Sequence, residues 1–203
     1  PIKFMVPVGL SFYTLQMIAY MTDVYRGKQK AENNLFKMAL YLSFFPQVME
    51  GPISRFAEVA DSLYEGRKIA FKNLKFGYQR MVWGLFKKIV VADRLYATVT
   101  HVFDNYHELS GAVVAFGVIC YTAQLYMEFS GCMDIIIGSS EVFGVKLPEN
   151  FRQPFAAKDA SEFWRRWHIT LGTFFKDYIF YPVSLAKPVK NLAKKVKEKF
   201  GRS

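Results

Sequence analysis

Two stretches of this 203-residue chain carry no charged residue over a length that can cross a lipid bilayer. The first extends from Phe4 to Thr22 and the second from Leu109 to Met127. A transmembrane helix needs about 20 consecutive, mostly apolar residues to cross roughly 30 Å of hydrocarbon. The two runs therefore predict an all-α, polytopic helical bundle, a multi-pass protein of the cell membrane.

The composition agrees with lipid contact once the chain is divided into segments. Hydrophobic residues make up 52% of the chain and aromatic residues 17%, including 20 phenylalanines. The mean hydropathy is only +0.08, because uncharged segments alternate with basic connectors and the two cancel in the average. The lipid bilayer is therefore an expected partner.

The formal net charge of +10 admits nucleic acid binding, an anionic membrane surface, or cytoplasmic loops that follow the positive-inside rule. Proteins that bind single-stranded nucleic acid interleave aromatic and basic residues on exposed elements. In this chain most aromatic residues lie inside uncharged runs. We therefore expect no nucleic acid partner.

The residues that could bind a metal do not form a recognisable site. Cys120 and Cys132 have neither CxxC nor zinc-site spacing, so we expect buried thiols. His101 and His107 are six residues apart, which does not place them on one helical face, although two carboxylates lie nearby. We favour histidines of a surface loop and expect no metal site.

The segment from Phe71 to Ala92 has the periodicity of a basic amphipathic helix. Its apolar residues recur every three or four positions, while its basic residues lie largely off that stripe. This pattern is typical of a helix in the membrane interface. Periodicity alone equally describes a bundle helix of a soluble protein. The stripe consists of Phe71, Leu74, Tyr78, Met81, Leu85 and Ile89.

The stretch from Asp159 to Pro182 concentrates the side chains best suited to chemistry. Asp159 and Glu162 have capping-box spacing, which predicts a helix that begins near Ala160. At helical spacing, one face of that helix would carry Trp164, His168, Leu171 and Phe175. The imidazole would then lie among apolar groups.

Two short uncharged runs follow, residues 167–175 and 178–186, and neither is long enough to cross the bilayer. A re-entrant or broken helix fits them better. Irregular backbone at membrane depth is tolerated only where protein or a water-filled cavity surrounds it. We therefore expect polar groups to face a pocket inside the membrane.

Other polar residues lie close to apolar segments. Glu50 and Arg55 flank the Gly51-Pro52 turn, where they either line the mouth of a cavity or belong to an interfacial loop with a structural ion pair. Asp134 follows the second uncharged run and needs a partner or a cavity so close to hydrocarbon. The triplet 129–131 (Phe-Ser-Gly) is expected to break the helix before it.

Six blocks together resemble the membrane-bound O-acyltransferases, in the order in which that family carries them. The nearest branch is the alginate O-acetyltransferase type, with the D-alanyl transferase of teichoic acids as a cousin. The blocks are Pro7–Gly27, Phe44–Phe56, Gly84–Leu95, Tyr126–Gly138, Phe143–Phe155 and Glu162–Pro182. The resemblance implies a helical bundle with a funnel into the membrane.

The resemblance also implies a reaction, the transfer of an acetyl or other acyl group to a hydroxyl of an extracytoplasmic polysaccharide. His168 matches the histidine of the family's FW-x-RWH block, which lines the reaction tunnel. The family's second histidine, in a WHG-like block further along, has no match before Ser203. Residues 1–203 are therefore expected to form a partial domain that is inactive alone.

In this mechanism a histidine accepts the proton of a sugar hydroxyl while the oxygen attacks an acyl carbonyl. We expect His168 to support the missing histidine. Trp164, Arg166, Trp167 and Asp177, with Glu50, Arg55 and Asp134, are candidate tunnel residues, although packing or structural ion pairing competes for each. The list of site residues is thus His168, Trp164, Arg166, Trp167, Asp177, Glu50, Arg55 and Asp134.

No bound cofactor is expected; acetyl-CoA or an acyl carrier would be the donor substrate. The acceptor would be an extracytoplasmic polysaccharide or an acyl-accepting partner protein outside the cytoplasm. Three alternatives stay open. They are D-alanyl transfer to teichoic acid, a non-enzymatic transporter segment with interrupted helices, and a peripheral basic amphipathic module.

Overall fold

The computed structural model describes residues 9–66 and 69–201, and within them the regular secondary structure is helical apart from one isolated β-bridge. The all-α prediction is confirmed for this part. In chain order the elements are α1 (Leu10–Tyr25), α2 (Leu35–Leu42), α3 (Phe56–Tyr64), α4 (Phe71–Leu85), the π-helical η1 (Phe86–Ala92), α5 (Asp93–Asp104), α6 (Gly111–Val142), the short 3-10 turn η2 (Pro154–Ala156), α7 (Ala160–Arg166), α8 (Ile169–Phe174), the π-helical η3 (Phe175–Phe180), α9 (Tyr181–Leu185) and α10 (Lys187–Phe200).

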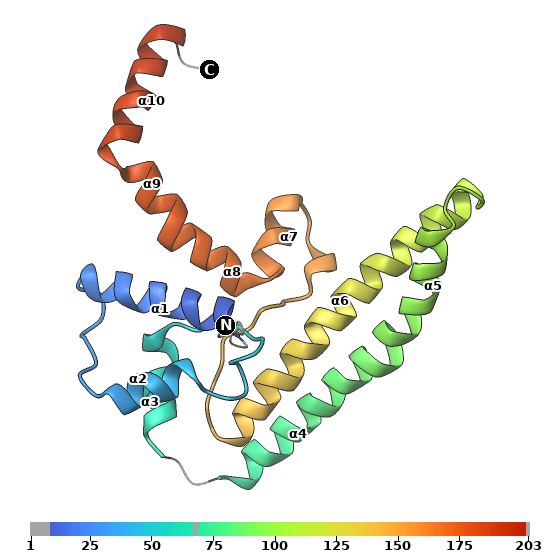
Figure 1. The fold of residues 1–203 in the computed structure, drawn as a ribbon, viewed down its shortest axis with the longest axis horizontal. Helices are drawn as coiled ribbons and strands as arrows, with labels where there is room; N and C mark the ends of the chain where they lie inside the picture. Colours follow the sequence, from blue (N-terminus) through green and yellow to red (C-terminus); the bar gives the residue numbers. More distant parts are fainter. Residues whose placement is uncertain (1–8, 67–68, 202–203) are drawn as a thin grey trace, which may run out of the picture.

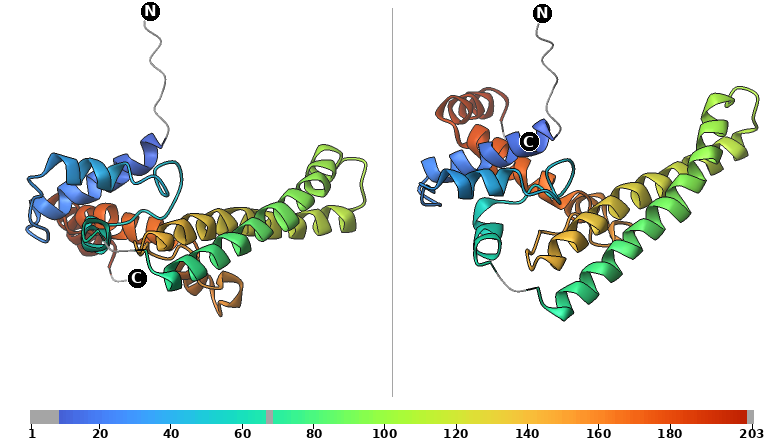
Figure 2. Two further views of the ribbon diagram at one scale, coloured as in Figure 1. Left: turned by 90° about the horizontal axis from the view of Figure 1, so that it is seen from below. Right: turned by 60° about the horizontal axis from the view of Figure 1, so that its bottom comes forward.

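A long helical hairpin is the dominant feature of the molecule. One arm is the continuous run α4–η1–α5 and the other is α6, and the two lie antiparallel along their length (Figure 1). The hairpin projects from a smaller body that contains α1, α2, α3 and the helices after α6 (Figure 2). The loop at residues 105–110 therefore lies far from that body.

The two arms of the hairpin touch through glycines. A Cβ atom built on Gly84 would lie 2.5 Å from the carbonyl oxygen of Gly131, and one built on Gly77 would lie 2.6 Å from that of Gly138. Gly77 and Gly84 are seven residues apart on α4, and Gly131 and Gly138 are seven residues apart on α6, so the glycines recur on one face of each helix. Small residues let membrane helices approach until their backbones are in contact. We call this contact the glycine seam.

Charged side chains pair across the same hairpin. Asp134 of α6 accepts hydrogen bonds from the Arg80 guanidinium at 2.9 Å and from the Lys87 ammonium at 2.6 Å. Lys88 donates to Glu128 one turn and a half further toward the hairpin tip. Asp134 was expected to need a partner, because a carboxylate in a weakly hydrated site must be paired. The bonds from Arg80 and Lys87 confirm that prediction.

The expected break at residues 129–131 is wrong, because α6 continues through them. Gly131 allows the backbone of α6 to approach Gly84 closely, and packing against neighbouring α4 stabilises the helix at this point. Among the described residues, α6 is the helix that is long and apolar enough to cross a membrane. The second uncharged run therefore forms a candidate span.

The first uncharged run is only partly described, because residues 4–8 lie outside the described residues. Its described part forms α1, which has 16 residues and falls short of a full span. A polytopic, multi-pass arrangement thus stays a prediction.

The segment from Phe71 to Ala92 is helical, as its periodicity predicts, with π-helical geometry from Phe86 onward. The side that packs against α6 carries Gly77, Gly84 and Ala92, which are buried. The predicted apolar stripe faces largely outward, with Phe71 80% exposed. The segment is therefore one arm of a helix pair whose apolar side is left free for lipid or for other parts of a longer protein.

The smaller body has an aromatic core with a buried polar centre. Tyr41 and Phe56 pack edge to face with ring centroids 5.2 Å apart. At the Gly51-Pro52 turn, Ser54 donates to Gln47 Oε1 (2.9 Å) and accepts from Gln16 Nε2 (3.2 Å). These bonds fix the loop before α3 against α1, because buried polar groups without partners are costly.

Candidate functional site

The helix predicted to carry Trp164 and His168 on one face is interrupted between them. Helix α7 ends at Arg166, Trp167 is extended, and α8 begins at Ile169. His168 has φ 45° and ψ 53°, in the left-handed region that costs a non-glycine residue about 1–2 kcal/mol. The single-helix prediction is therefore wrong at this point, although a broken helix was expected within the stretch.

A paired segment explains the interruption. The Arg152 backbone N–H donates to the Arg166 carbonyl, and the Ile169 N–H donates to the Asn150 carbonyl, each at 3.0 Å. Between these bonds, Phe151 and Trp167 form an isolated antiparallel bridge. The Arg166 carbonyl and the Ile169 N–H are thus satisfied on this neighbour, while the Trp167 N–H still donates to the Phe163 carbonyl of α7.

Asn150 caps helix α8 from outside the helix. The residue at the cap position, His168, makes no capping bond. Asn150 is fully buried, and its Oδ1 accepts from the Thr170 N–H at 3.1 Å and from the Thr170 hydroxyl at 2.7 Å. The Thr170 hydroxyl oxygen in turn accepts from the Ile53 N–H at 3.0 Å. A short polar side chain at the cap position usually accepts these bonds. Because Asn150 does so here, the imidazole of His168 does not need to cap α8.

The His168 ring lies edge-on against Phe129 of α6, with ring centroids 4.8 Å apart. Its Nε2 is buried and has no hydrogen-bond partner within the described residues. Burial lowers the pKa of His168 below its ordinary value of 6.5, because desolvation disfavours the charged imidazolium. The ring is therefore neutral at pH 7 and can both accept and donate a proton.

A second strained residue lies beside this turn. Gln153 has φ 47°, and its carbonyl accepts from the Arg166 guanidinium at 3.3 Å. Gln153 and His168 are the described non-glycine residues with positive φ. Such strain persists where surrounding structure enforces it, and it gathers at functional sites.

A small polar cavity of about 190 Å³ lies between the hairpin and the segment that pairs with the His168 turn. Arg80 spans it, with two guanidinium nitrogens 2.7 and 2.6 Å from the Glu149 carboxylate oxygens. Phe129, which contacts His168, also packs edge-on against Phe151 of the cavity wall at 5.0 Å. The lining residues are Arg80, Lys87, Tyr126, Ser130, Met133, Asp134, Glu149, Asn150, Phe151, Arg152 and Gln153.

Three other candidates precede His168 in the same stretch, and the structure places them differently. Trp167 stacks on Phe163 with centroids 5.6 Å apart and meets Phe151 edge-on. Arg166 pairs with Glu162 at 2.6 Å. Trp164 is 66% exposed on the outer side of α7. Trp167 and Arg166 thus shape the turn, whereas Trp164 borders a separate groove beside α8.

The start of α7 follows the predicted capping pattern in part. Asp159 Oδ1 accepts from the Glu162 N–H at 2.7 Å, which confirms the cap. The Glu162 carboxylate accepts from the Lys158 N–H at 2.8 Å instead of from the cap residue itself. The first turn is therefore satisfied by side chains, with the return bond shifted by one residue.

Arg55 and Asp177, which are far apart in the sequence, form an ion pair in the body. Arg26, the residue after α1, donates to the Asp177 carbonyl at 3.1 Å, and the neighbouring Tyr178 hydroxyl donates to Asp23 at 2.6 Å. This cluster ties η3 to the end of α1. Arg55 thus pairs with Asp177 and not with Glu50.

Glu50 lies at a third place, in an apolar groove of about 420 Å³ between the loop at residues 45–50 and the hairpin. Burial is the main cause that raises the pKa of its carboxyl group. Asp134 belongs to the polar cavity. The structure therefore distributes the predicted residues over several places and brings only Trp167, Arg166 and His168 into one turn.

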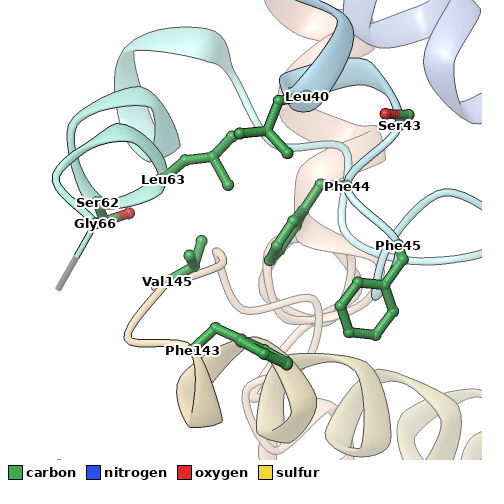
Figure 3. A pocket seen from close by; sticks show the side chains of 9 residues that line it. All are labelled: Leu40, Ser43, Phe44, Phe45, Ser62, Leu63, Gly66, Phe143 and Val145. Carbon is green, nitrogen blue, oxygen red and sulfur yellow. The ribbon is translucent and has the colours of Figure 1, made fainter. Parts of the chain in front are cut away.

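A further pocket of about 320 Å³ lies between α2, α3 and the end of α6, and its lining is mainly apolar, with Ser43 and Ser62 at its edge (Figure 3). Leu40, Leu63, Phe44 and Val145 gather around it, and Phe45 and Phe143 meet edge-on at 5.4 Å. None of the predicted site residues lines it.

Within the described residues, no group of three or more His, Cys, Asp or Glu side chains is placed to hold a metal ion. Cys120 is buried and Cys132 is half-buried, and both are free thiols. His101 and His107 lie at the tip of the hairpin, where His107 contacts the ring of Tyr106.

Sequence reasoning missed Asn150, Phe129 and Glu149. The available signal was their position inside two of the resembling blocks, together with an asparagine between Pro148 and Pro154. What each of them contacts depends on pairing between distant segments, which composition does not reveal.

The six blocks and the helical architecture agree with the family that matches this sequence. A sequence model described as MBOAT, membrane-bound O-acyltransferase family, matches residues 30–195. The chain belongs to the membrane-bound O-acyltransferase family. The resemblance predicted from the six blocks is thereby confirmed.

Curated relatives agree with this assignment. The chain is 39% identical over 176 residues to the probable alginate O-acetylase AlgI of Pseudomonas aeruginosa, covering 87% of this chain and 34% of the relative. It is 34% identical to the peptidoglycan O-acetyltransferase of Helicobacter pylori (87% and 38% covered) and 28% identical to the teichoic acid D-alanyltransferase of Bacillus subtilis (85% and 44%). The chain thus spans between a third and a half of the length of these relatives.

Proposed function

We propose that the full-length protein that carries this chain is a multi-pass membrane O-acyltransferase. It moves an acetyl group, or another acyl group, onto a hydroxyl of an extracytoplasmic polysaccharide. Family membership and relatives named as alginate O-acetylase and peptidoglycan O-acetyltransferase support this proposal. Acetyl transfer is favoured over D-alanyl transfer because the acetyltransferase relatives are 34–39% identical and the D-alanyltransferases 26–28%.

The observation that carries the proposal is the His168 turn. A histidine with an unpartnered, buried Nε2 is held in left-handed backbone by pairing with residues 150–152. A buried polar atom without a partner loses the free energy of a hydrogen bond. A substrate group that bonds Nε2 would recover it.

In the proposed reaction the acceptor hydroxyl oxygen attacks the acyl carbonyl carbon, and the new ester bond forms as the bond to the donor's leaving group breaks. The hydroxyl proton passes to an imidazole, which returns it to the leaving group. We assign the base to the second histidine that the resemblance places further along. His168 holds a reacting oxygen or its proton through Nε2.

The donor is a substrate and not a resident cofactor. Acetyl-CoA or an acyl carrier supplies the acyl group, and the acceptor is a polysaccharide or an acyl-accepting partner protein outside the cytoplasm. The membrane setting is supported by α6, with further spans expected in the first uncharged run and in the rest of a longer protein.

The proposal is tested by replacing His168 with Gln in the full-length protein and measuring ester-linked acetyl groups on the cell's extracytoplasmic polysaccharide. We expect a loss of at least tenfold with unchanged membrane insertion. His107→Gln, at the hairpin tip, is the matched control and should retain wild-type ester content. Full acetylation by His168→Gln would remove His168 from the mechanism.

Two alternatives have distinct outcomes in the same experiment. D-alanyl esters in place of acetyl esters would show the reaction of the Bacillus subtilis relative. A His168-dependent solute flux without any ester would identify a transporter. We also propose that the isolated 203-residue chain transfers no acyl group, and measurable transfer by it alone would disprove that.

A further inference from the structure

Helix α10 has a two-sided surface that the proposed reaction does not use. Its 14 residues include six lysines and one glutamate. Every described side chain from Lys187 to Glu198 is exposed. The helix follows α9 after a break at Ala186, where the backbone is extended, and it extends away from the hairpin (Figure 1).

One side of α10 is an apolar stripe. Val189, Leu192 and Val196 are spaced by three and four residues, so they share one helical face. Their exposed fractions are 38%, 62% and 48%. An exposed stripe of this kind on a strongly charged helix indicates a surface that something apolar covers.

The lysines are arranged around that stripe in a characteristic way. Lys190 follows Val189 and Lys197 follows Val196 by one residue, which places both on one border of the stripe. Lys195 precedes Val196 and lies on the other border. Lysine stems on such borders can cover apolar surface while their ammonium groups reach headgroups.

The opposite face is purely polar. Lys194 and Glu198 lie there, with their nearest charged atoms 3.9 Å apart and side chains 78% and 64% exposed. A pair this exposed contributes little to stability. This charged, exposed face is suited to contact with water.

We propose that α10 lies in the plane of the membrane interface, with its apolar stripe in the bilayer and its bordering lysines on anionic lipid headgroups. The charge favours anionic over zwitterionic lipid, because each lysine near such a surface is attracted by its negative potential. A bilayer matches both features at once, because an apolar interior lies beneath an anionic surface. The helix is thus a lipid-sensitive anchor for the end of the α8–α9 run.

The test uses the full-length protein in nanodiscs, with Cys120 and Cys132 replaced by Ala and one environment-sensitive label at Leu192→Cys. The matched control carries the label at Lys194→Cys on the polar face. Both are read with a quencher carried by lipid and a quencher dissolved in water. A single size-exclusion peak and an unchanged thermal unfolding midpoint confirm that each labelled protein is folded.

In discs that contain phosphatidylglycerol, the label at position 192 should be quenched from the lipid and the label at 194 from water. Replacing Lys190, Lys195 and Lys197 with Gln should lower the ratio of lipid-contacting to water-exposed label at 192 on the order of 100-fold, since each lysine contributes roughly fivefold. Phosphatidylcholine discs should give a similar loss.

Three results would overturn the proposal. Quenching of both labels from water in every lipid would place α10 off the membrane. Protection of position 192 from both quenchers would mean that another protein segment or an acidic partner covers the stripe. Equal lipid contact in neutral and anionic discs would remove the role of charge. None of these results depends on acyl transfer, so the proposed function stands or falls separately.

Discussion

Replacing Gly84 with Ala tests whether the two arms of the hairpin touch through their backbones. The new Cβ would lie 2.5 Å from the Gly131 oxygen and 2.9 Å from the Ile135 nitrogen, whereas ordinary contact begins at 3.4 Å. The arms would have to separate by about 0.9 Å at this point to relieve the closest contact, because backbone atoms cannot turn aside as a flexible side chain can.

The magnitude follows from two opposing effects. Overpacking of a tight contact costs roughly 1–3 kcal/mol, and the upper half applies because the obstructing atoms are backbone. Ala is favoured over Gly inside a helix by about 1 kcal/mol. We therefore expect Gly84→Ala to lower the free energy of unfolding by about 1–2 kcal/mol. The separation would also lengthen the bond between Lys87 and Asp134, which is 2.6 Å.

The assay is unfolding of the purified protein in detergent micelles, followed by the loss of its helical circular dichroism signal. Gly111→Ala is the matched control, because it lies on α6 and a Cβ there meets nothing within 4 Å. It should be neutral or slightly stabilising. If Gly84→Ala is as stable as Gly111→Ala, the arms are not in backbone contact and the glycine seam is refuted.

Three further substitutions test the site and the hairpin. Asn150→Ala should lower the free energy of unfolding by about 2–3 kcal/mol, because α8 loses a cap and buried donors are left unpaired. In the same denaturation assay, Asn34→Ala removes the exposed cap of α2 and should cost about half as much. Equal losses would contradict the buried network around Asn150. The lowered pKa of His168 means that the unfolded chain binds a proton more readily than the folded chain, so the free energy of unfolding should fall as the pH drops below 6.5. Thermal unfolding of His168→Gln across that pH range should lack this fall. If both proteins lose stability equally with falling pH, His168 does not contribute. Asp134→Asn should cost about 1–2 kcal/mol, because Lys87 loses its carboxylate partner while Arg80 keeps Glu149. Adding Lys87→Met should recover part of the loss, and no recovery would mean that the Lys87–Asp134 pair is not the cause.

The hairpin shows what a sequence pattern can and cannot predict. The uncharged run that ends at Met127 predicts a membrane-spanning helix, and α6 contains it. The expected break beyond it was wrong because a glycine can either end a helix or admit a neighbouring one. Gly131 does the second, and only the position of Gly84 on the other arm decides between the two.

The candidate site illustrates the same limit at closer range. The residues Asp159 and Glu162 predict the start of α7, because capping is a local interaction. The left-handed conformation of His168 could not be predicted, since it depends on pairing with residues 150–152 and on the Asn150 cap. Both interactions join segments that are separated by other structure in the chain.

The length of α6 has a consequence for where water can reach. At about 1.5 Å per residue, its 32 residues extend for about 48 Å, whereas the hydrocarbon layer is roughly 30 Å thick. Even at a tilt of about 40°, the steepest commonly seen, such a helix protrudes by several ångströms. The uncharged half before Glu128 is the part suited to the hydrocarbon core of a bilayer. If α6 spans the bilayer as proposed, the other half, with Asp134 and the Arg80 cavity, would extend toward the headgroups, within reach of a hydrophilic substrate of the proposed reaction.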